Sequence, residues 1–191
     1  LISIPVLKNH VYTGITGAVK NVGIGGTPGK IYGNGPTNSY PTQREGIDHG
    51  ADNSFRENLH KWIHDFYACK PVDFVVMDGI QGSDKGPVGY GYESLSEAQR
   101  NMRMILAGKD AIAVDAIEAL IMSHDPQKIA HLVYLNNSGF GCANPALIKV
   151  LGPQVETIRE NFKISDSGGR SKFNTFECKN YKIENAVYNN D

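Results

Sequence analysis

Short apolar segments alternate along this chain with segments of helical spacing. The stretches LISIPVL at residues 1–7 and VDFVVMD at 72–78 are rich in apolar and β-branched residues, which is typical of buried strands. Alternating strands and helices predict an α/β fold, a mainly parallel sheet flanked by helices, with the 72–78 strand central because it is apolar nearly throughout. Further strands are expected at residues 103–107 and 146–151, and helices at 54–68 and 110–123.

Bulk properties favour a single domain and exclude several classes of protein. A chain of 191 residues fits one domain, and residues 165–191 read as a weakly patterned tail. The net charge of −1 gives no basic stripe for nucleic acid, and no apolar run reaches the length of a membrane span. Three scattered cysteines form no zinc or iron–sulfur motif and favour a reducing compartment, so a cytoplasmic location is expected.

The segment KNHVYTGITGAVKNVGIGG, residues 8–26, places cations and amides in a glycine-rich stretch. Two nucleotide-binding templates fail there. Pro28 occupies the third glycine position of GxGxxG, and Ile24 and Ile31 occupy the first glycine and the Ser/Thr position of GxxxxGK[ST]. What remains is a set of polar side chains that follows a strand end, where ligands bind in α/β sheets. Lys8, His10, Lys20 and Asn21 are therefore expected to hold a small anion.

Carboxylates on other segments complete the expected site. Asp78 ends the central strand, and Asp110 caps the helix that follows the 103–107 strand. Asp115 and Glu118 are the only charged residues inside that apolar helix and share one face of it. A buried carboxylate is costly unless it is paired, hydrogen-bonded, protonated or metal-bound. Lys8 or Lys20 could be the partner of Asp115, either as a structural ion pair or as part of a ligand site.

His60 and His64 have the i, i+4 spacing of a helical metal pair, but HKWIH lacks the glutamate of HExxH. A solvated polar face is the preferred interpretation of both histidines, and His131 is given no role.

Several motifs taken in order resemble the "domain of unknown function 362" family of bacterial and archaeal proteins. The resemblance covers roughly residues 1–152 and implies little established chemistry. Some relatives carry ferredoxin-type iron–sulfur modules, and members have residues upstream of the first strand, so this chain is expected to be the C-terminal portion of a larger domain. The matching positions are Pro5, Lys8 and His10, then Lys20–Gly23, Asp78 and Gly79, and finally Ala107, Gly108, Asp110, Ala113 and Asp115.

Two hypotheses for function follow. In the first, a cleft lined by Lys8, Lys20, Asn21, Asp110 and Asp115 binds a small anionic or metal-chelated ligand or cofactor of unknown identity, as in an enzyme. His10 or Asp78 would then transfer protons, and the lysines would stabilise charge. In the second, the chain is a non-catalytic accessory domain of an iron–sulfur redox protein, and its polar groups form a buried salt-bridge network. A solvent-accessible pocket would favour the first, and sealed, mutually paired groups the second.

Overall fold

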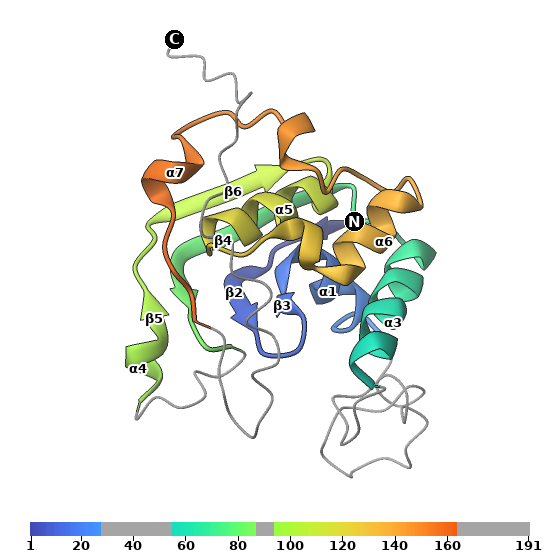
Figure 1. Ribbon diagram of the computed structural model, residues 1–191, viewed down its shortest axis with the longest axis horizontal. Helices are drawn as coiled ribbons and strands as arrows, with labels where there is room; N and C mark the ends of the chain where they lie inside the picture. The colour runs from blue at the N-terminus through green and yellow to red at the C-terminus, as the bar shows by residue number, and fades with distance from the viewer. Residues whose placement is uncertain (28–54, 87–93, 164–191) are drawn as a thin grey trace.

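The computed structural model describes residues 1–27, 55–86 and 94–163, and these form a sheet with helices packed against it (Figure 1). The long strand β4 (Phe74–Ser83) is central. On one side it pairs in parallel with β1 (Ile2–Ser3) and β2 (Val6–His10), which follow each other along the same edge. On the other side it pairs antiparallel with β6 (Met104–Gly108). The sheet is completed by two short antiparallel strands, β3 (Gly14–Ile15) beside β2 and β5 (Gln99–Arg100) beside β4.

Three helices build the core against this sheet. α1 (Gly17–Gly23) and α5 (Ala111–Ile121) pack on the sheet and on each other, and α3 (Phe55–Cys69) packs on α1. α6 (Ala130–Asn137) packs against α3 and α5, as Figure 1 shows to the right of α5. The remaining short elements are α4 (Leu95–Ala98), the 3-10 turns η1 (Pro126–Lys128) and η2 (Pro145–Leu147), and α7 (Val155–Ile158).

The two faces of the sheet differ in burial. Side chains of β4 alternate, so that Val75 and Met77 are fully buried in the core whereas Ile80 is 56% exposed. The paired strands follow the same alternation, because residues directly opposite each other point to the same face. Exposed aliphatic side chains therefore gather on the face turned away from the helices, here called the open face: Ile2, Ile4, Val6, Ile80 and Ile105.

The α/β class and the central position of the 72–78 strand are confirmed, and so are the helices expected at 54–68 and 110–123. The strand expected at 146–151 is wrong. Pro145 and the Asn144 side chain, which accepts a hydrogen bond from the Ala146 N–H, start a 3-10 turn there, and the residues after it join no strand. Of the glycine-rich loop at residues 23–50, only the first five lie within the described residues, and the tail at 165–191 lies outside them. No helix of the described part is both long and apolar enough to cross a membrane.

One-sided burial of β4 predicts unequal costs for two truncations on the same strand. Met77→Ala should lower the free energy of unfolding by about 2–5 kcal/mol, because it leaves a cavity in the core. Ile80→Ala is the matched control and should change it by less than about 0.5 kcal/mol. Urea denaturation of both variants measures the difference. Equal losses would mean that the open face is covered in solution.

Candidate functional site

The first turn of α1 is held by a carboxylate from another helix. Thr16 occupies the N-cap position but makes no capping hydrogen bond with its side chain. Instead, the Ala18 N–H donates to Asp115 Oδ1 at 2.7 Å and the Val19 N–H donates to Asp115 Oδ2 at 2.9 Å. These are two of the N–H groups that the start of a helix leaves without partners. Asp115, on α5, thus takes over the role that an N-cap side chain normally has.

This arrangement requires glycine at position 17. Gly17 has a φ of +56°, and a Cβ atom there would lie 2.3 Å from Asp115 Oδ2. The missing side chain lets the carboxylate approach the backbone of α1. The close approach of Asp115 therefore explains the glycine at position 17, although glycine weakens a helix.

Glu118 lies one turn after Asp115 and is also fully buried, which confirms that both carboxyl groups share a buried face. Its Oε1 accepts a hydrogen bond from the Lys8 N–H at 3.4 Å, whereas its Oε2 is buried without a partner among the described residues. Burial raises the pKa of Asp115 to about 7, although the Val19 and Ala18 N–H groups oppose that rise. Burial, and then the charge of Asp115, raises the pKa of Glu118 well above its usual value, which favours the protonated form.

Lys20 lies on the same helix as the capped N–H groups and is only 5% exposed. Within the described residues its amino group has neither an ion-pair partner nor a hydrogen bond to an acidic side chain. Burial, with a second contribution from the charge of Lys8, lowers the pKa of Lys20 well below its ordinary value. The predicted pairing of Asp115 with Lys8 or Lys20 is therefore replaced by pairing with backbone N–H groups.

Two buried histidines lie near enough to Lys20 for its charge to act on them. His60 on α3 and His131 on α6 stack with ring centroids 5.1 Å apart, and their Nδ1 atoms are 2.9 Å from each other. Burial lowers the pKa of His60 to about 4 and that of His131 well below its usual value, and the charge of Lys20 lowers both further. The solvated face predicted for His60 is wrong, because His60 is 5% exposed. The sequence signal for this burial was the spacing along α3. His60 precedes Ile63 by three residues and Tyr67 by seven, so it lies on the same face of the helix as these two buried side chains.

The remaining predicted site residues fall in different places. His10 is buried, and its Nδ1 accepts a hydrogen bond from the Tyr12 N–H at 3.2 Å. Asn21 is exposed and donates to Ser3 Oγ. Asp110 caps α5 through the Ala113 N–H and also accepts from the Cys142 N–H.

Asp78 is exposed beside Val6 and Ile105 on the open face. The structure therefore brings Lys8 and Lys20 into one region with Asp115 and Glu118, but it does not bring Asp78 there. Two pockets lined by described residues lie away from Lys8, Lys20 and Asp115. One, which includes Asp110, runs along β6, the start of α5 and the segment 148–151, and the other lies between α3 and α6 around His64 and Tyr134.

Residues 1–119 match the family described as "Domain of unknown function (DUF362)", and the chain belongs to that family. No curated protein and no solved structure matches the chain significantly. The matched segment contains Lys8, Lys20, His60 and both buried carboxyl groups, and it ends before α6, which supplies His131.

The raised pKa of Asp115 predicts a specific dependence of stability on pH. The folded chain holds the Asp115 proton more tightly than an unfolded chain does, so this contribution is full below about pH 4 and is lost as the pH rises to about 7. Asparagine cannot ionise. The stability of the wild type relative to Asp115→Asn should therefore fall by about 3–4 kcal/mol between pH 4 and pH 8, measured by urea denaturation.

The lowered pKa values of His60 and His131 act in the opposite direction but are common to both proteins, so they cancel in this difference. A difference that does not change with pH would show that Asp115 stays ionised throughout.

Close approach at Gly17 predicts a large cost for a single methyl group. Gly17→Ala places a Cβ against Asp115 and should lower the free energy of unfolding by at least about 3 kcal/mol. Gly139→Ala is the matched control, because Gly139 has a φ of +78° but a Cβ added there would meet no atom within 4 Å. It should cost only about 1 kcal/mol. Similar losses in thermal or urea unfolding would contradict the close approach.

Proposed function

We propose that this chain binds a small anionic ligand at a buried group of bases beside α1. This basic cluster consists of the buried Lys20, His60 and His131 and the half-buried Lys8. The observation that carries the proposal is the burial of Lys20 without an acidic partner in the described residues. A buried ammonium group is costly unless it is paired, and an anionic ligand would supply the missing charge.

The electrostatics of the cluster support an anion rather than a cation. Both causes that lower the pKa of Lys20, burial and the charge of Lys8, disfavour a further positive charge. The negative charge of an arriving anion would oppose both and raise the pKa of Lys20. Binding is therefore expected to draw a proton from solution, in an amount that depends on pH.

The carboxyl groups are not included in the proposed ligand set. Asp115 and Asp110 already accept hydrogen bonds from backbone N–H groups, and this favours a structural role for both. Such paired groups are what the competing hypothesis of a scaffold domain expects. That hypothesis does not account for Lys20, whose amino group remains without an acidic partner in the described residues.

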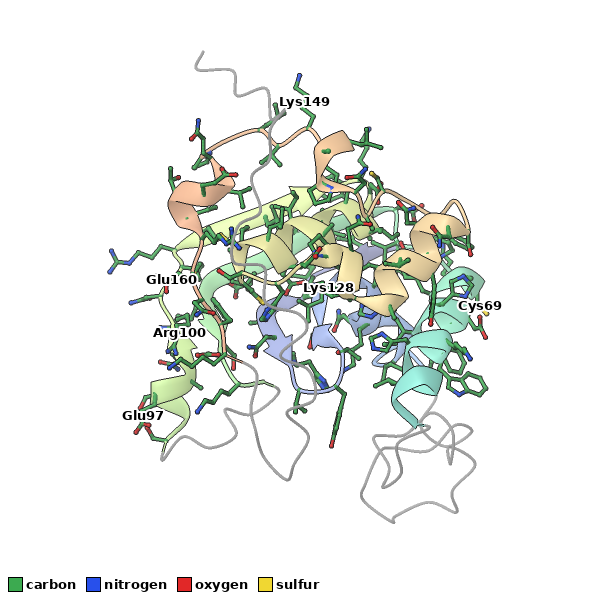
Figure 2. All side chains as sticks on the ribbon, in the orientation of Figure 1. Cys69, Glu97, Arg100, Lys128, Lys149 and Glu160 are labelled. Atoms are coloured by element: carbon green, nitrogen blue, oxygen red, sulfur yellow. The ribbon has the colours of Figure 1, made fainter. Side chains whose placement is uncertain are left out.

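Isothermal titration with inorganic phosphate, sulfate and citrate tests the proposal. We expect at least one of these anions to bind and to raise the melting temperature, and Lys20→Met to weaken that binding at least about tenfold. Without ligand, Lys20→Met should melt at an equal or higher temperature than the wild type, because it removes a buried amine. Lys149→Met is the matched control, since Lys149 is exposed and lies at the upper edge of the molecule in Figure 2.

Unchanged binding by Lys20→Met, or no binding of any of the three anions to the wild type, would count against an anion site and favour the scaffold hypothesis.

A further inference from the structure

The hydrogen bonds of the histidine pair fix which ring nitrogens carry protons. His60 Nδ1 accepts the backbone N–H of His131 at 3.2 Å, so this nitrogen carries no proton. The proton of the neutral His60 ring is then on Nε2. His131 Nδ1 lies 2.9 Å from the unprotonated His60 Nδ1 and must donate to it. The neutral His131 ring therefore has its lone pair on Nε2.

His131 Nε2 is an acceptor without a donor. His131 is fully buried, and its Nε2 has no hydrogen-bond partner among the described residues. Buried polar atoms are nearly always paired, so an unpaired one calls for an explanation. His60 holds the ring in the tautomer that leaves Nε2 open, in the way that a second residue orients a ligating histidine.

Two further groups of the same region lack partners. Lys20 is near enough to His131 for its charge to lower the pKa of the ring. Thr16, at the N-cap position of α1, has a buried Oγ1 without a hydrogen-bond partner in the described part of the chain. Lys20 and His131 thus offer an amino group and an imidazole acceptor.

We propose that His131 Nε2 accepts a hydrogen bond from a hydroxyl group carried by the anion, so that the ligand is a protonated oxyanion such as hydrogen phosphate or a phosphate monoester. Lys20 contacts the charged oxygens, and the P–OH group donates to His131 Nε2. Sulfate has the same size and shape but carries no proton near neutral pH, so it leaves Nε2 unpaired. The inference rests on the anion site proposed above and adds the chemistry that selects its ligand.

Titrations with inorganic phosphate and sulfate test this selection at pH 6.5, where phosphate is largely the monoanion. The wild type should bind phosphate at least about tenfold more tightly than sulfate, the size expected of one hydrogen bond to a charged group. His131→Phe should lose that preference and keep its affinity for sulfate within about threefold. Lys20→Met should weaken both anions alike.

Nitrogen NMR of the histidine rings in the wild type gives an independent measurement that needs no variant to fold. The spectrum should show His131 protonated at Nδ1 and unprotonated at Nε2, and phosphate but not sulfate should shift the Nε2 signal. A proton on His131 Nε2 would overturn the inference. Equal affinities for phosphate and sulfate, or binding of citrate alone, would overturn it as well while leaving the anion site intact, whereas no binding of phosphate, sulfate or citrate would overturn both proposals. The groups that face His131 and could alter its titration are His60 on α3 and Lys20 on α1.

Discussion

The capping of α1 by Asp115 is the contact around which this part of the chain is organised. Two backbone N–H groups of α1 meet one carboxylate of α5, so the two helices are fixed at a distance that leaves no room for a side chain at position 17. Because Asp115 is fully buried, loss of the contact would leave N–H donors and a carboxyl group unsatisfied together. Helix packing, backbone conformation and the protonation of a carboxyl group are thus linked at one point.

That contact also decides the charge balance of the region. The two oxygens of Asp115 accept hydrogen bonds from backbone N–H groups rather than from a lysine, and burial raises the pKa of Glu118 well above its usual value, which disfavours a negative charge there. Lys20 and its neighbouring histidines therefore remain without a compensating acid in the described residues, although α5 brings two carboxyl groups close to α1. These bases thus lack acidic partners in the described residues because the carboxyl groups of α5 accept hydrogen bonds from backbone N–H groups instead.

The sequence was sufficient for the fold class, because short apolar and β-branched segments alternate along it with helical ones, and β4, α3 and α5 were recognised in this way. It was also sufficient to recognise Asp115 and Glu118 as buried, since both interrupt an apolar helix. The partners of Asp115 could not be predicted, because backbone N–H groups leave no mark in residue types. His60 was misjudged because it lies at the border of the apolar face, where the packing of α6 decides burial. The strand expected at 146–151 failed because strand propensity cannot supply a neighbouring strand.

The open face makes contacts of the molecule sensitive to salt and to temperature. Ile2, Ile4, Val6, Ile80 and Ile105 present aliphatic carbon to water, and burial of such surface is favoured by kosmotropic salts and weakened on cooling. High concentrations of ammonium sulfate are therefore expected to promote contact through this face, and cooling is expected to weaken it.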